Sequence, residues 1–215
     1  MAPKDSEYTE EALIEKPAMD LFSQLDWSVQ SCSYEFDENG KSILGRETKA
    51  DVILVSKLKP TMKKINPSLS ETIFNESIKI LTEDRSLMGM VSANRKVFDL
   101  LKNGILVSYL NNKNEHVSER VQIIDWGNIE NNDFFLASQF WISGEMYTRR
   151  ADLVGFVNGI PLLFMELKAS HRNLKKAYDE NLRDYKSTIP QLFWFNGMII
   201  LSNNSQSRVR TLSAE

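Results

Sequence analysis

Residues 149–168 read RRADLVGFVNGIPLLFMELK. Two apolar runs, 153–157 and 160–165, flank Asn158-Gly159, and an Asn-Gly pair between apolar runs is typical of a β-hairpin. The hairpin begins with Asp152 and ends with Glu166 and Lys168. Buried strands seldom hold such charges unless the charges are paired or bind a metal ion. The sequence therefore predicts a functional site at the start and end of this hairpin.

The spacing of these charges favours a metal site. Glu166 and Lys168 lie two residues apart, so they share one face of a strand. If Asp152 joins that face, two carboxylates converge beside one lysine. Two oxygen ligands with open positions suit Mg²⁺, which keeps several waters and accepts phosphate oxygens from a substrate.

The metal interpretation sets a condition on the turn. In a plain two-residue turn Asp152 faces Met165, which places Glu166 on the opposite face. We therefore predict a β-bulge or an odd register, for example a three-residue turn with a left-handed Gly159 and with Asp152 paired to Phe164. The structural alternative is that Asp152 caps the strand start and that Glu166 and Lys168 form an ordinary surface pair.

The composition limits the class of protein and the kinds of site that the chain can contain. The chain has 215 residues, of which 42% are hydrophobic and 26% charged, as is usual for a soluble globular protein. A single cysteine, Cys32, excludes an internal disulfide and a four-cysteine zinc site. No stretch resembles a signal peptide or reaches the roughly 18 apolar residues of a membrane span, so we expect a cytoplasmic protein without membrane contact. No GxxxxGK[ST] loop is present, so we expect no ATP site of that type in this chain.

Charge is unevenly distributed. The formal net charge is −3, yet residues 149–186 hold eight Lys or Arg and five Asp or Glu. A local positive field of this kind suits a phosphate backbone, and a solvated helix face is the alternative explanation.

Periodicity and turn residues predict an α/β core with mixed strand pairing. We expect helices over 10–25, 66–81, 86–102 and 173–186, and strands over 105–110, 120–125, 134–142, the two hairpin arms, 198–202 and 209–212. The region 28–65 is ambiguous, and 51–55 fits either a strand or a helical turn.

Four stretches together resemble the N-terminal nuclease domain of type I restriction enzyme R subunits, which belong to the PD-(D/E)xK superfamily. They are YTEEALIEKPAMDLFSQLDW (8–27), NDFFLASQFWI (132–142), the hairpin 149–168 and NGMIILSNN (196–204). The resemblance implies a restriction-endonuclease-like core, a central mixed sheet flanked by helices, over about 9–27 and 105–215. A helical insertion would occupy about 66–103 of this single nuclease domain.

The resemblance also implies roles for individual residues. Asp152 and Glu166 would bind Mg²⁺, for which Mn²⁺ can substitute, together with the backbone carbonyl of Leu167. Lys168 would be the catalytic lysine. Glu15 matches an acidic residue of the first helix that lies near the metal, with a solvated helix glutamate as the alternative.

A Gln-x-x-x-Tyr motif of the family has its nearest match in Asn181 and Tyr185, where the shorter asparagine puts the expected DNA contact in doubt. For Tyr185 the alternative is a core aromatic. The basic residues expected to hold the DNA backbone are Arg149, Arg150, Arg172, Lys175 and Lys176.

The implied function is Mg²⁺-dependent cleavage of duplex DNA. In the family, translocation is driven by ATP in a motor absent from this chain, and the partners are modification and specificity subunits. The isolated domain need not cut DNA. Two other functions remain open: a non-catalytic docking or DNA-clamping module of the restriction complex, and a stand-alone repair nuclease on the same core.

Overall fold

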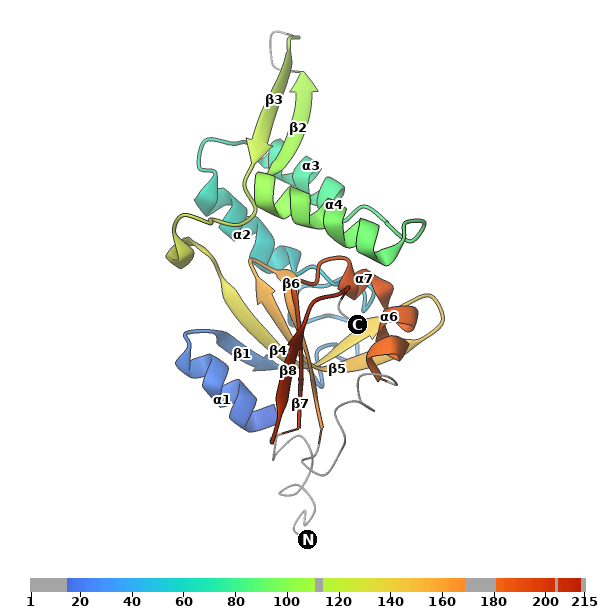
Figure 1. Ribbon diagram of the computed structural model, residues 1–215. Coiled ribbons are helices and arrows are strands. Elements are labelled where there is room, and N and C mark those ends of the chain that lie inside the picture. Colours follow the sequence, from blue (N-terminus) through green and yellow to red (C-terminus); the bar gives the residue numbers. More distant parts are fainter. Residues whose placement is uncertain (1–14, 111–113, 169–180, 204, 214–215) are drawn as a thin grey trace.

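The computed structural model describes residues 15–110, 114–168, 181–203 and 205–213 (Figure 1). Over these ranges the chain is an α/β structure with a central mixed sheet flanked by helices. The elements in chain order are α1 (Lys16–Gln24), β1 (Ser28–Ser31), α2 (Val55–Ile65), α3 (Glu71–Leu81), α4 (Met90–Asn103), β2 (Ile105–Leu110), β3 (His116–Val121), η2 (Ile129–Asn131), β4 (Phe134–Ser143), β5 (Thr148–Val157), β6 (Ile160–Leu167), α6 (Arg183–Thr188), α7 (Pro190–Phe193), β7 (Met198–Ser202) and β8 (Ser207–Arg210). No helix among the described residues is long and apolar enough to cross a membrane.

The main sheet has six strands in the order β1-β4-β5-β6-β7-β8. Antiparallel pairing joins β4 to β5, β5 to β6 and β7 to β8, whereas β1 pairs with β4, and β6 with β7, in parallel. Each parallel pair needs a crossover connection. The segment between β1 and β4 contains α2, α3 and α4, and the segment between β6 and β7 contains α6 and α7. This topology confirms the predicted α/β class with mixed pairing.

The strands β2 and β3 form a separate two-stranded antiparallel sheet. It packs against α3 and projects away from the main sheet (Figure 1). The predicted strand 105–110 is confirmed. The strand predicted over 120–125 instead runs from His116 to Val121, because its pairing with β2 fixes its bounds.

The helix boundaries differ from the prediction at their N-termini. The helix predicted from residue 66 begins at Glu71, after Ser70 in an extended conformation, and the helix predicted from residue 86 begins at Met90. Pro67, expected at the start of this helix, lies in a turn before it. The side chain of Asn66 donates to Met62 O and Gln122 O, both at 2.8 Å, and so ties the end of α2 to the chain after β3.

Other helix predictions fall partly outside the described residues. From 10–25 the structure describes α1, and from 173–186 it describes α6, while residues 1–14 and 169–180 lie outside. The helix α2 fills part of the ambiguous region, and residues 51–54, which fitted a strand, form the irregular approach to it.

The β5–β6 hairpin has a two-residue turn and a bulge. Asn158 and Gly159 both have positive φ, 52° and 78°, and Val157 pairs with Ile160. The predicted three-residue turn is therefore wrong. The register shifts one step further along, because Phe156 pairs with Pro161 but Gly155 pairs with Leu163, leaving Leu162 as the extra residue.

This bulge confirms the predicted shift of register but moves it from the turn into β6. Phe164 pairs with Val154, not with Asp152 as predicted, and Leu153 pairs with Met165. Continuing the same register, Asp152 lies across from Glu166. Side chains opposite each other in an antiparallel pair lie on the same face, so the condition for the metal site is met.

The sheet separates two cores. Phe135, Phe156 and Phe164 belong to the larger core, against which α2, α3, α4 and α7 pack. Met165 and Leu167 belong to the smaller core beside α1. Glu166 alternates with Met165 and Leu167, so it points away from the smaller core.

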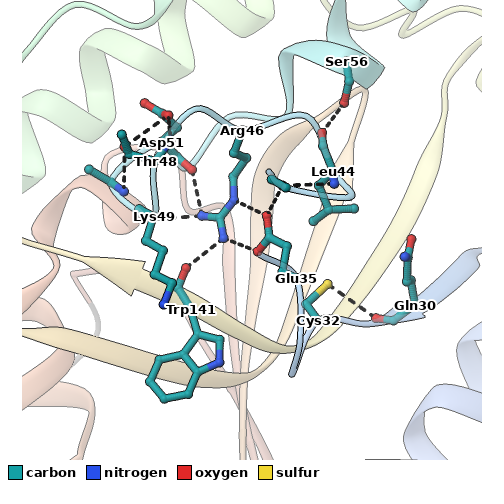
Figure 2. Close-up of polar contacts among 12 residues, drawn as sticks. Gln30, Cys32, Glu35, Leu44, Arg46, Thr48, Lys49, Asp51, Ser56 and Trp141 are labelled. Carbon is teal, nitrogen blue, oxygen red and sulfur yellow. Dashed lines mark hydrogen bonds and ion pairs between the residues drawn. The ribbon is translucent and has the colours of Figure 1, made fainter. Parts of the chain in front are cut away.

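A buried ion pair fixes the loop between β1 and α2 (Figure 2). The side chains of Glu35 and Arg46 are fully buried and form a salt bridge, with Arg46 Nε donating to Glu35 Oε1 at 2.7 Å. The same guanidinium donates to Asp51 O at 2.9 Å and to Trp141 O at 3.0 Å. It also lies 4.0 Å from the ring centroid of Phe140. The guanidinium is therefore bound by one carboxylate and two backbone carbonyls, and the loop is tied to β4.

Arg46→Met should lower the free energy of unfolding by about 3–5 kcal/mol, because it leaves the Glu35 carboxylate buried without its counter-charge. Urea unfolding measures the effect. The matched control is Lys79→Met, which removes the exposed pair to Glu76 and should cost about 1 kcal/mol or less. Equal effects of the two substitutions would contradict a structural role for the buried pair.

Candidate metal and nucleic-acid site

The two carboxylates of the hairpin lie at the end of the β5–β6 ladder. Asp152 Oδ2 accepts a hydrogen bond from the backbone N–H of Leu167 at 2.7 Å, which links it directly to β6. Glu166 is only 2% exposed. Its Oε2 atom is buried and has no hydrogen-bond partner among the described residues. A buried carboxylate oxygen without a donor is costly unless another ligand completes it.

Lys168 and Asn181 both contact the other oxygen of Glu166. Lys168 Nζ lies 2.6 Å from Glu166 Oε1, and Asn181 Nδ2 donates to the same atom at 2.7 Å. The Lys168 side chain keeps 22% of its surface exposed. Its backbone N–H donates to Ser202 O, which continues the pairing with β7 past the end of β6.

Tyr185 closes the site from α6. Its hydroxyl donates to Arg150 O at 2.9 Å, and its ring packs edge-on against Phe164 at 5.3 Å. Burial and then the negative charges of Glu166 and Asp152 raise the pKa of the Tyr185 hydroxyl. The hydroxyl therefore stays protonated and keeps donating. The asparagine and tyrosine of the shortened motif are thus brought together around the carboxylates, with the Asn181 amide directed at Glu166.

Glu15, immediately before α1, lies near these groups and is 5% exposed, so a solvated helix glutamate is excluded. Gln139 Nε2 donates to Glu15 Oε1. Sequence reasoning missed Gln139, which sits in β4 with a φ of 56°. The register places it across from Asp152, between the pairs Ser138–Leu153 and Phe140–Ala151. No local sequence signal marks a glutamine for the left-handed region, so nothing in the pattern could have identified it.

The electrostatics of the site favour a bound cation. The pKa of Asp152 is raised to about 7, first by burial and then by the negative charge of Glu166. Glu15 adds to this increase, whereas the Leu167 N–H and the Lys168 charge oppose it. A divalent cation would relieve the repulsion between these carboxylates.

The ligand set offered is small. Among the residues that the structure describes, no three Asp, Glu, His or Cys side chains gather in a geometry that could hold a metal ion. Two carboxylates and one backbone carbonyl, with water or substrate in the remaining positions, are the ligands that Mg²⁺ tolerates. Asp152, Glu166 and the carbonyl of Leu167 could supply these three positions.

The predicted basic residues separate into different environments. Arg149 forms a salt bridge with Asp184 at 2.9 Å and is thereby neutralised. Arg150 is exposed and lies over the ring of Trp141. Arg172, Lys175 and Lys176 lie outside the described residues.

Comparison with known proteins gives consistent matches. A family model described as "Type I restriction enzyme R protein N terminus" matches residues 7–215. A type I restriction enzyme endonuclease subunit, HindI, of Haemophilus influenzae is 30% identical over 87% of this chain and 18% of its own length. A protein of Methanocaldococcus jannaschii, named as the type I restriction enzyme MjaIXP endonuclease subunit, is 28% identical over 97% of this chain and 20% of its own length. The chain spans about a fifth of the length of these relatives.

Asp152→Asn should change how stability depends on pH in the presence of a chelator. Because the pKa of Asp152 is raised to about 7 in the folded chain, folding favours the protonated carboxyl group. The free energy of unfolding should therefore fall as the pH rises from about 4 to 7, by on the order of 1 kcal/mol per unit from this group. The variant lacks this decline, so its stability relative to the parent should increase with pH.

Urea unfolding at several pH values between 5 and 8 measures the difference. Asp20→Asn, at an exposed position of α1, is the matched control and should run parallel to the parent. A parallel curve for Asp152→Asn as well would show that Asp152 is not held among competing negative charges.

Proposed function

Because this chain belongs to the family of type I restriction enzyme R protein N termini, we propose that it is the Mg²⁺-dependent nuclease domain of such a subunit, with a PD-(D/E)xK core. Its substrate would be the phosphodiester backbone of duplex DNA. The two relatives that match most of the chain are named as endonuclease subunits, which supports this class of activity.

One observation carries the proposal. The carboxylate of Glu166 is buried across from Asp152, and its Oε2 atom has no hydrogen-bond partner among the described residues. Lys168 and Asn181 occupy Oε1 and leave Oε2 free for another ligand. Buried like charges of this kind gather at functional sites more often than in structural cores.

Asp152, Glu166 and the Leu167 carbonyl would hold the ion. When bound there, Mg²⁺ supplies Lewis acidity toward a phosphate oxygen and lowers the pKa of a bound water. The N–H of Leu167 orients Asp152 by donating to Oδ2, so that the other oxygen is available for binding. Asn181 fixes the rotamer of Glu166 in the same way.

Lys168 would act on the reacting phosphate. Its ammonium group is anchored by Glu166 and its side chain is partly exposed, and there it would stabilise charge on the phosphate or orient the attacking water. Tyr185 holds the β5 backbone at Arg150. Glu15, oriented by Gln139, adds negative charge that would strengthen cation binding.

The rest of the activity would belong to the full-length protein. There we propose ATP-driven translocation in motor regions that this chain does not include, and assembly with modification and specificity subunits that supply DNA recognition in the cytoplasm. The chain spans about a fifth of its relatives, which leaves room for such regions.

Glu166→Gln and Lys168→Gln should each lower DNA cleavage by about 100-fold or more when placed in the full-length protein assembled with its partners. The amide keeps the shape of Glu166 but removes the charge that binds the cation. The measurement is linearisation of a plasmid in the presence of ATP and Mg²⁺, with ATP hydrolysis recorded in the same samples.

ATP hydrolysis should stay unchanged, because it belongs to other regions of the protein. Asp20→Asn serves as the control for the cleavage assay. Cleavage within about twofold of the parent for Glu166→Gln would instead favour a non-catalytic docking or DNA-clamping module.

A further inference from the structure

Two cations that the metal site does not use converge on one tryptophan. Lys49 Nζ lies 5.3 Å from the ring centroid of Trp141, and Arg150 Cζ lies 5.4 Å from it. Trp141 and Arg150 are paired neighbours on β4 and β5. Lys49 comes from the loop between β1 and α2, far away in the sequence. We refer to Lys49, Trp141 and Arg150 as the Trp141 cluster.

Within the described ranges, no ion pair neutralises the two positive charges of the Trp141 cluster. Among the residues that the structure describes, neither Lys49 nor Arg150 has a carboxylate within 4.0 Å, whereas neighbouring Arg149 is paired with Asp184. Cation–π contact orients the two groups but does not cancel their repulsion. An anion placed between or beside them would do so.

The cluster is held in place before any ligand arrives. Lys49 O accepts from the N–H of Ser143 at 3.0 Å, which joins the loop to the end of β4. Arg46, fixed by Glu35, donates to Trp141 O at 3.0 Å (Figure 2). Figure 2 shows the Lys49 side chain running from this loop toward Trp141. The buried ion pair therefore positions a basic residue on the sheet.

The cluster also lies close to the proposed metal site. Arg150 precedes Asp152 by two residues on β5, a distance of roughly 7 Å along a strand. Tyr185, which closes the site, donates to the Arg150 carbonyl. A polymer whose phosphate reached Asp152 and Glu166 would have a neighbouring phosphate within reach of the cluster.

We propose that Lys49 and Arg150, oriented by Trp141, bind a phosphate of the DNA backbone next to the phosphodiester held at Asp152 and Glu166. The inference rests on the proposed nuclease function and adds a positioning subsite to it. Contacts of this kind fix the register of the duplex and carry no sequence information. Of the two adjacent arginines, Arg150 and not Arg149 would then make the contact.

The test is binding of a fluorescein-labelled duplex to the 215-residue chain, followed by anisotropy at several salt concentrations in EDTA. Lys49→Gln/Arg150→Gln should weaken binding at least about tenfold at low salt and reduce the slope of log K against log salt by about 1, the value for one phosphate that is no longer neutralised. Lys79→Gln/Lys96→Gln removes the same charge from paired residues on α3 and α4, and should leave the slope nearly unchanged. Trp141→Leu keeps both charges and should weaken binding by releasing their orientation.

Equal slopes for the two double variants would overturn the subsite, because the effect would then be one of net charge. No binding of the parent chain at low salt would overturn it as well. The assay contains no metal, so its outcome does not depend on cation binding by Asp152 and Glu166. If the cluster governs binding but Glu166→Gln leaves cleavage intact, the nuclease proposal fails and the phosphate subsite stands.

Discussion

The register of β5 against β6 is the constraint on which the site depends. Side chains alternate with a period of two along a strand, so a slip of one residue would exchange the faces of Glu166 and Leu167. The extra residue Leu162 sets the observed register. Gly155 permits the bulge, because a side chain there would come within 3.0 Å of Leu163 and 3.1 Å of Trp27. A small local irregularity thus brings Asp152 and Glu166 to one face.

The molecule treats its buried charges in two different ways. Glu35 and Arg46 are opposite charges that pair with each other, and Arg46 also donates to a backbone carbonyl. This arrangement fits a structural role in fixing a loop. Asp152 and Glu166 are like charges, and the pKa of Asp152 is raised first by burial and then by the negative charge of Glu166. The first arrangement is complete within the described residues, whereas the repulsion in the second would be relieved by the proposed cation. Through Trp141 and Lys49, the structural pair also shapes the surface beside the proposed metal site.

The sequence predicts the strands β4 to β7 of the main sheet well, because apolar and aromatic runs separated by turn residues are local signals. It does not predict β1, which lies in the ambiguous region 28–65. The runs 134–142 and 198–202 match β4 and β7 closely. The sequence did not predict the helix α2, because Pro60 and four lysines interrupt the apolar pattern of its buried face. Its buried residues Leu58 and Met62 are recognisable only once the sheet beneath them is known.

The candidate site divides in the same way. Asp152, Glu166 and Lys168 are identifiable from the sequence, because charged residues stand out beside the apolar runs of a hairpin. Lys49 and Gln139 depend on contacts far along the chain and on an unusual backbone angle. A bulge could be predicted because Asp152 and Glu166 must share one face to bind a metal ion. Its place in β6 could not be predicted, because a register shift can be accommodated at several positions of a hairpin.

The most direct measurement is the position of a bound metal in crystals of the chain grown with Mn²⁺ at pH 8, located by anomalous scattering. At this pH Asp152 is mostly ionised, since its pKa is about 7. We expect a peak about 2.0–2.3 Å from carboxylate oxygens of both Asp152 and Glu166. That peak should be absent from crystals of Glu166→Gln. A peak away from both carboxylates, or no peak between them at saturating metal, would contradict a metal-dependent nuclease site in the hairpin.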